Sequence, residues 1–113
     1  MHIADLCRES QSIAVAHGWR ESPRTFGDEI ALMHSELSEA LEEFRAGHPV
    51  DQVRHEQAAD RTFKPEGVPA ELADVVIRVC EAAAHYGIDL EEAINVKLAY
   101  NRTRSYRHGG KRL

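Results

Sequence analysis

Residues 69–86 are apolar on nearly every side of the helix that their pattern predicts. Val, Ile, Leu, Cys and Ala fill most positions, and Pro69 stands in the first helical turn, where proline is well tolerated. The charged line of this helix consists of Glu71, Asp74, Arg78 and Glu81. Because almost all of its surface needs apolar cover, we expect this helix at the centre of a helical domain. The charged line therefore needs an explanation of its own.

Three other segments carry apolar side chains at helical spacing. They are residues 3–17, 25–46 and 89–104. Thr25 and Asp89 are good N-caps, and each is followed three residues later by an acid, as in a capping box. With seven Gly and four Pro in 113 residues, and neither a strand pattern nor a repeat, the sequence predicts an all-α, four-helix bundle. Residues 1–113 are expected to form a single domain.

The longest connection between predicted helices is residues 47–68, which are polar and irregular. Within it, residues 51–59 are predicted as a short helix. Connections of this length in a small domain are often functional. The amphipathic helices around the apolar third helix would leave apolar surface uncovered, so we expect a partner subunit to complete the core.

Two short acidic signatures lie on separate predicted helices. Glu36 and Glu39 form one pair, and Glu71 and Asp74 form the other; a spacing of three residues places each pair on one side of its helix. If the helices face one another, four carboxylates converge, although two unit charges ~4 Å apart repel by roughly 4 kcal/mol at an intermediate dielectric. A cation would relieve that repulsion. All-oxygen ligation suits Mg²⁺, with Mn²⁺ as a substitute.

Each signature also has an ordinary explanation. A Glu-x-x-Glu pair is commonly a solvated helix face, and Glu71 in a first turn complements the helix dipole. Asp74 is harder to explain in this way, because Asp is a poor mid-helix residue and this one lies in the most apolar segment. Zinc and di-iron sites fit less well, since the sequence contains no Cys-x-x-Cys and no Glu-x-x-His.

A polar line on the last predicted helix offers donors for phosphate oxygens. Lys97, Asn101 and Arg104 recur at i, i+4 and i+7. Cations near the end of a helix also complement its dipole, so the line has a second explanation. Trp19 could stack on a nucleotide base, although packing in the core is the commoner role of a lone Trp. These four residues are our candidates for substrate binding.

The formal net charge of −5 argues against general binding to nucleic acid, since that affinity comes from neutralising phosphates. Residues 105–113 nevertheless form a basic tail. Cys7 and Cys80 occupy apolar helical positions, where we expect buried thiols in a reducing compartment. The N-terminus has no signal-peptide pattern and no apolar run approaches a membrane span, so a cytoplasmic protein without a membrane partner is expected.

A non-enzymatic interpretation is also open. In it, the chain is a dimeric helical binding module whose basic tail docks on nucleic acid or on an acidic partner, while the acids only increase solubility. This interpretation predicts salt-sensitive binding and no nucleotide turnover.

The order of these motifs resembles a known family. The motifs are Glu36-x-x-Glu39, then Glu71-x-x-Asp74, then Lys97 and Asn101 on a final helix. This order is similar to that of the all-α nucleoside triphosphate pyrophosphohydrolases, the MazG-like proteins. Relatives of that superfamily include the dimeric dUTPases, the dCTP pyrophosphatases and phosphoribosyl-ATP pyrophosphohydrolase. The resemblance extends from Trp19 to about residue 107.

The resemblance implies a homodimer or a dimer of dimers, with the site near a subunit interface. It implies that the four acids bind Mg²⁺ and that Lys97 and Asn101 contact the nucleotide. The expected reaction is hydrolysis of a nucleoside triphosphate, most simply a deoxynucleotide, to the monophosphate and pyrophosphate. Mg²⁺ held by the four acids would lower the pKa of a bound water, or Glu36 or Glu39 would instead act as the general base on that water. Lys97 and Arg104 would stabilise charge on the leaving pyrophosphate.

Overall fold

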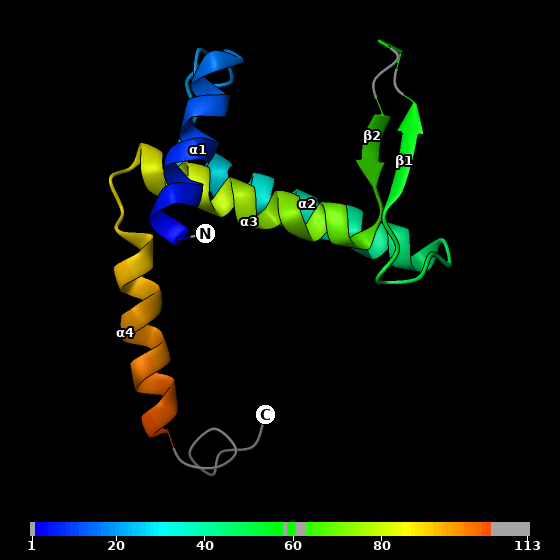
Figure 1. Ribbon diagram of the computed structural model, residues 1–113. Helices are drawn as coiled ribbons and strands as arrows, with labels where there is room; N and C mark the ends of the chain where they lie inside the picture. The colour runs from blue at the N-terminus through cyan, green and yellow to red at the C-terminus, as the bar shows by residue number, and fades with distance from the viewer. Residues whose placement is uncertain (1, 58, 61–62, 105–113) are drawn as a thin grey trace.

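The computed structural model describes residues 2–57, 59–60 and 63–104. In chain order its elements are α1 (Ile3–Ala16), α2 (Phe26–Arg45), β1 (Arg54–Gln57), β2 (Phe63–Glu66), α3 (Val68–His85) and α4 (Leu90–Thr103) (Figure 1). The four predicted helices are confirmed, with ends close to those expected. The basic tail, residues 105–113, lies outside the described residues, so the binding-module interpretation stays a prediction.

The predicted N-caps are present. Asp28 N–H donates to the Thr25 hydroxyl (3.1 Å) and Thr25 N–H donates to the Asp28 carboxylate (2.8 Å), which completes a capping box at the start of α2. Asp89 accepts from the backbone N–H of Glu92 (3.0 Å) and caps α4 through this single bond. These local bonds fix where the helices that carry the candidate residues begin.

The connection between α2 and α3 differs from the prediction. The short helix expected at residues 51–59 is wrong, and so is the expectation that the chain has no strands. β1 and β2 form an antiparallel pair in which His55 lies opposite Pro65. Most side chains of both strands are exposed, so the segment has no apolar alternation that could reveal it in the sequence.

A close backbone contact ties the hairpin to the start of α3. Gly67 has φ +118°, a conformation that favours glycine, and a Cβ at this position would lie 2.3 Å from the backbone oxygen of Gln52. Only a residue without a side chain fits there. The base of the hairpin is therefore fixed one turn before Glu71.

α3 packs against both α1 and α2 and is the central helix, as predicted. α2 and α3 lie side by side and antiparallel, the hairpin stands off one end of this pair, and α4 extends away beyond the other end (Figure 1). α4 meets α1, where Ala4 N–H donates to Glu91 Oε1 (3.4 Å). The radius of gyration is 17.0 Å, whereas a compact chain of this length has about 13 Å. A closed four-helix bundle is thus not formed within one chain.

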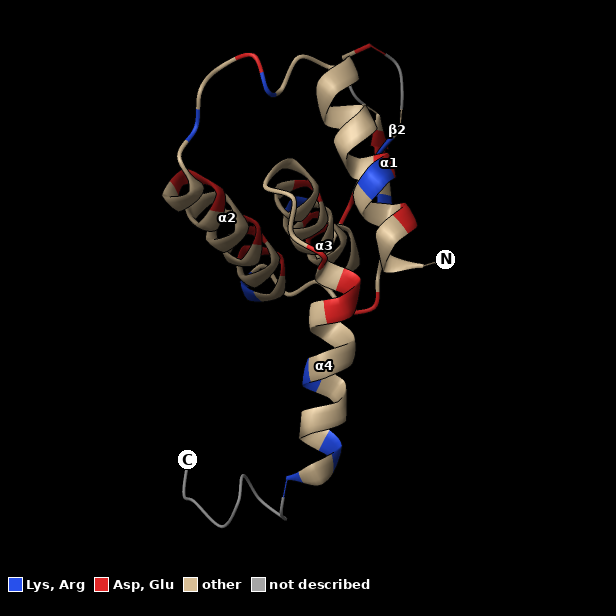
Figure 2. Cartoon of the chain, turned by 90° about the vertical axis from the view of Figure 1, so that its left-hand side faces the viewer, with Lys and Arg blue, Asp and Glu red and all other residues tan. Residues whose placement is uncertain are grey.

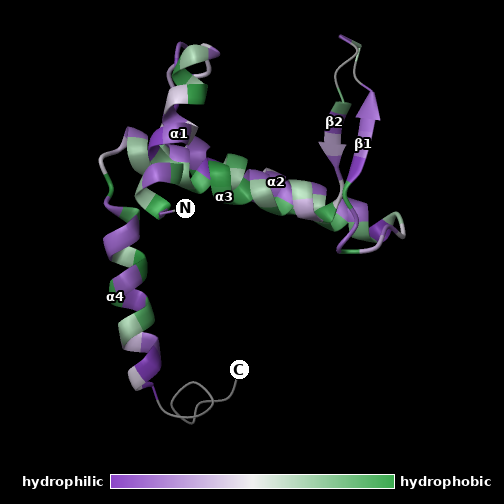
Figure 3. Ribbon diagram, viewed as in Figure 1, coloured by the Kyte–Doolittle hydropathy of each residue, from purple (hydrophilic) through white to green (hydrophobic). Residues whose placement is uncertain are grey.

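The apolar residues buried in this arrangement are all of small or medium size. They are Cys7, Ala14, Ala40, Val68, Cys80, Ala82 and Ala83, so both predicted buried cysteines are confirmed. The apolar stripe expected on α2 exists but stays open to solvent, with Leu41 54% and Phe44 60% exposed. Within the described part of α4 no residue is buried, although apolar positions recur along it (Figure 3). The apolar faces of α2 and α4 are therefore not covered by the chain itself.

Among the described residues, none of the helices combines the length and the apolar character needed to cross a membrane.

Candidate functional site

The two acidic signatures meet where α2 packs on α3. One carboxylate oxygen from each of Glu36, Glu71 and Asp74 lies within 4.8 Å of the others. Glu39 lies beside them, close enough to shift the pKa of both Glu36 and Glu71. A spacing of three residues on each helix and antiparallel packing of the pair produce this convergence. The structure thus brings together all four of the predicted acids.

Two of the four acids are almost withdrawn from water. Glu36 is 8% and Glu71 9% exposed, whereas Glu39 and Asp74 are exposed. Glu71 Oε2 is buried and has no hydrogen-bond partner among the described residues. Burial raises the pKa of Glu71 to about 7, and the hydrogen bond and charge of Glu39 and the charges of Asp74 and Glu36 add to the rise. A cation placed among these oxygens would stabilise the ionised form of Glu71.

Glu36 is paired with an arginine on the facing helix. Arg78 Nε donates to Glu36 Oε1 at 2.7 Å. Burial by itself would raise the pKa of Glu36, but hydrogen bonds with Arg78, Glu39 and Glu71 bring it below its usual value. Glu36 therefore stays ionised near neutral pH.

A cavity of about 750 Å³ opens beside the acids. Its wall is formed by Ser10, Ile13, Ala14, Trp19, Arg24, Glu29, Glu36, Lys64, Asp74, Ile77, Arg78 and Glu81. Trp19 is 56% exposed and stacks on His17, with 5.5 Å between ring centroids. The interpretation of Trp19 as a core residue is therefore wrong. Its indole lies on the wall of the cavity, where it can meet a ligand.

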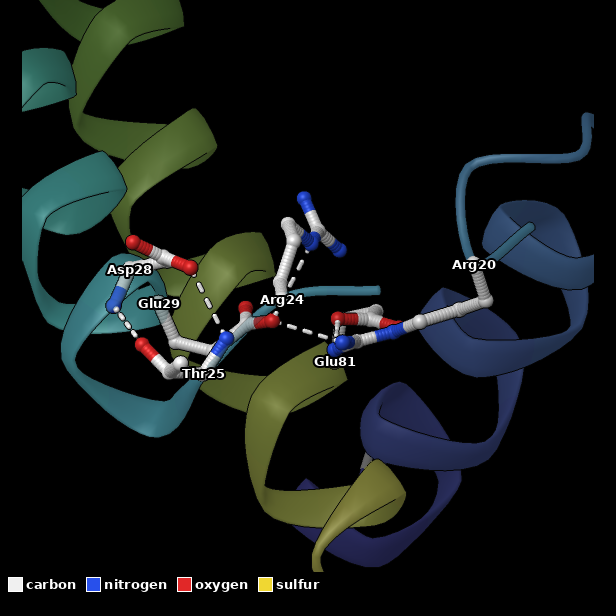
Figure 4. A network of polar contacts seen from close by, with 6 residues as sticks. All are labelled: Arg20, Arg24, Thr25, Asp28, Glu29 and Glu81. Atoms are coloured by element: carbon white, nitrogen blue, oxygen red, sulfur yellow. Dashed lines mark hydrogen bonds and ion pairs between the residues drawn. The ribbon is translucent and has the colours of Figure 1, made fainter. Parts of the chain in front are cut away.

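One wall of the cavity is held by a buried ionic network that connects the α1–α2 connection to α2 and α3 (Figure 4). Arg20 donates to Glu29 Oε1 through Nη1 (2.6 Å) and to Glu81 Oε1 through Nε (2.6 Å), and its Nη2 pairs with Glu81 Oε2. Arg24 Nε lies 3.2 Å from Glu29 Oε1. The side chains of Arg20, Glu29 and Glu81 are only 12%, 5% and 10% exposed.

Helical periodicity alone does not predict this network, although the sequence carries two signals for it. Glu29 lies on the same helical line as Glu36, and Glu81 lies on the charged line of α3. Arg20 and Arg24 are the bases between the first two predicted helices, so they were the natural partners for these acids.

The structure does not bring the predicted basic line of α4 to the acids within one chain. Lys97, Asn101 and Arg104 are exposed, and none of them lines the cavity. Lys97 Nζ and Arg104 Cζ instead lie 5.4 and 6.0 Å from the centroid of the Tyr100 ring. α4 is acidic where it begins and basic towards its end (Figure 2). The cations that do line the cavity are Arg24, Lys64 and Arg78.

The chain is similar to one curated enzyme over part of its length. A protein of Cyanophage S-2L, named dATP/dGTP diphosphohydrolase, is 50% identical to it over 49 residues. The aligned segment covers 43% of each protein. The similarity thus spans less than half of either chain. No protein-family model matches the chain, and no solved structure matches it significantly.

Proposed function

We propose that this protein is a Mg²⁺-dependent hydrolase that cleaves a deoxynucleoside triphosphate to the monophosphate and pyrophosphate. The observation that carries the proposal is the convergence of the Glu36, Glu71 and Asp74 carboxylates within 4.8 Å, beside a cavity large enough for a nucleotide. The partial similarity to the cyanophage enzyme supports the same class of reaction. Because that enzyme is named for dATP and dGTP, purine deoxynucleotides are the first substrates to test.

The residues at the convergence fit a hard divalent cation. All four side chains offer carboxylate oxygens, and Glu71 Oε2 is a buried oxygen without a partner among the described residues. Glu36, Glu39, Glu71 and Asp74 would hold the ion. When bound, Mg²⁺ supplies charge stabilisation for phosphate oxygens, and Mn²⁺ would serve as a substitute.

The other roles fall to side chains of the chain itself. Glu39 is exposed, whereas Glu36 is held by Arg78, so Glu39 is the better placed of the two candidates to take a proton from the attacking water. Trp19 offers an aromatic face to the base from the cavity wall. The Arg20 network excludes water from that wall and fixes the connection that carries Trp19.

A second copy of the chain is part of this proposal. The exposed apolar stripe of α2, with Phe26, Ile30, Leu37, Leu41 and Phe44 each at least 37% exposed, needs cover that the chain does not provide. α4 buries no described residue, and it carries the predicted nucleotide-binding line Lys97, Asn101 and Arg104 away from its own cavity. In a homodimer or a dimer of dimers, α4 of one protomer would bring that line to the site of another.

Release of pyrophosphate from dATP and dGTP in the presence of Mg²⁺ tests the proposal. Glu39→Gln and Asp74→Asn keep the shape of each side chain but remove its charge, so turnover should fall by about a hundredfold or more. Glu42→Gln is a matched control, because the Glu42 side chain is 68% exposed on the same helix and forms an exposed ion pair with Arg45. Unchanged rates in Glu39→Gln and Asp74→Asn would contradict the assignment of the site.

A further inference from the structure

Arg78 is a cavity residue to which neither the sequence analysis nor the proposed reaction gives a role in binding substrate. It follows Asp74 by one helical turn, so it projects from the same side of α3 as the acids. Its Nε donates to Glu36 Oε1, while neither of its terminal nitrogens bonds to any described residue. The side chain is 37% exposed. The guanidinium is thus anchored at one edge, and its remaining donors are available to a ligand.

Lys64 reaches the same cavity from β2 of the hairpin. Its ion pair with Glu66 (Nζ to Oε1, 3.2 Å) is weak, because the Lys64 side chain is 68% exposed to water. Lys64 also lies close enough to the acids to affect them electrostatically. Arg78 and Lys64 line the same cavity as Glu36 and Asp74. The two cations therefore act on the acid cluster from two different elements.

The charge balance of the site requires such cations. A divalent ion compensates only part of the negative charge of the four acids, and a polyphosphate adds further negative charge. Arg24, the third cation on the cavity wall, is already engaged with Glu29. Within one chain, the cations of α4 do not line the cavity. Within the chain that supplies the acids, Arg78 and Lys64 are thus the cavity cations available to the phosphates, in addition to those that α4 of a partner would bring.

We propose that Arg78 and Lys64 bind the β- and γ-phosphates of the substrate, Arg78 from α3 and Lys64 from the hairpin. This inference rests on the proposed function. Arg78 contributes a planar set of donors that matches phosphate oxygens, and Lys64 contributes a mobile point charge. The hairpin, whose base is fixed at Gly67, is then the element that places Lys64 beside the polyphosphate.

Calorimetric binding of inorganic pyrophosphate to the full chain with Mg²⁺ tests this proposal. Arg78→Gln and Lys64→Gln should each raise the Kd for pyrophosphate by about tenfold or more, because each removes a charge-assisted contact. The Kd for deoxyadenosine monophosphate, which lacks these phosphates, should stay unchanged. Arg45→Gln is the matched control, since Arg45 forms an exposed ion pair with Glu42 (3.0 Å), and both affinities should be as in the wild type.

Unchanged pyrophosphate affinity in both variants would overturn the proposal. If Arg78→Gln loses affinity for pyrophosphate and for the monophosphate equally, Arg78 only supports Glu36. That result would overturn the proposed role of Arg78 in binding phosphate. Arg78→Lys guards against a folding defect, because it keeps a charge beside Glu36 but removes the planar set of donors; it should give an intermediate Kd for pyrophosphate. If the wild type binds pyrophosphate through these residues but releases none from any deoxynucleotide, the proposed function fails, and Arg78 and Lys64 are left as a pyrophosphate-binding pair without the proposed substrate.

Discussion

The α2–α3 pair and α4 are built in opposite ways, although both carry candidate site residues. In the pair, the acids meet across a helix interface, and a nearby ionic network of Arg20, Glu29 and Glu81 is almost excluded from water. α4 has no buried residue among those described, and Lys97 and Arg104 lie near the exposed ring of Tyr100. In the proposed site, one chain therefore supplies the acidic half. The basic half proposed on α4 does not line the cavity of its own chain, and a second chain would have to bring it there.

Mixed oligomers test this division most strongly. Asp74→Asn and Asn101→Ala should each lower turnover by about a hundredfold when pure, since each removes one half of the site. If α4 serves the site of a partner, mixing the two variants after dissociation should restore about a quarter of the wild-type activity, because mixed dimers regain one intact site. Turnover is measured by pyrophosphate release. No recovery after mixing would place both halves in the same chain.

Arg20→Ala should destabilise the protein by about 3–5 kcal/mol, because it removes the partner of the buried Glu81 carboxylate and leaves the buried Glu29 carboxylate with Arg24 alone. Lys97→Ala on α4 should change stability by no more than about 0.5 kcal/mol, since this side chain is exposed. Urea unfolding measures both. A loss below about 1 kcal/mol in Arg20→Ala would mean that water reaches the network.

Mg²⁺ should stabilise the protein in a pH-dependent way. The pKa of Glu71 is about 7 in the folded chain against a usual 4.5, so between these values the folded state holds more protons than the unfolded state. Without metal, stability should therefore fall as the pH rises from about 4.5 to 7. Mg²⁺ binds the ionised form, so its effect should grow over the same range and reach about 2.7 kcal/mol at a hundred times its Kd.

Thermal melting with Mg²⁺ against chelator, at pH 5.5 and pH 7.5, measures this effect. Asp74→Asn should show little response to Mg²⁺ at either pH. A response to Mg²⁺ that is the same at both pH values would contradict the role given to Glu71.

Gly67→Ala should destabilise the protein by about 1–3 kcal/mol, because its Cβ would lie 2.3 Å from the Gln52 backbone oxygen in a strained conformation. Gly87→Ala, in the connection to α4, has a φ of +68°, in the left-handed helical region, and its Cβ would meet no atom within 4 Å, so it should cost less. Urea unfolding compares the two variants. Equal losses would show that the hairpin base is not tightly packed.

The sequence predicted what local patterns determine and missed what long-range contacts determine. Apolar periodicity and caps such as Thr25 gave the helices, and the spacing of the acids gave their convergence. The hairpin was missed because its strands are exposed and carry no alternation. The contact between Arg20 and Glu81 joins residues 61 positions apart, which no local pattern encodes. The direction in which α4 leaves the α2–α3 pair depends on the few residues that connect α4 to α3. The apolar periodicity within the helices could not predict that direction.

The central claim is that the acids of α2 and α3 hold a divalent cation. A titration of the protein with Mn²⁺ tests it directly, with the free Mn²⁺ measured by electron paramagnetic resonance. The wild type should bind Mn²⁺ saturably and Mg²⁺ should displace it, while a Glu71→Gln, Asp74→Asn double variant that still folds should bind none. Equal binding of Mn²⁺ by both proteins would contradict the account.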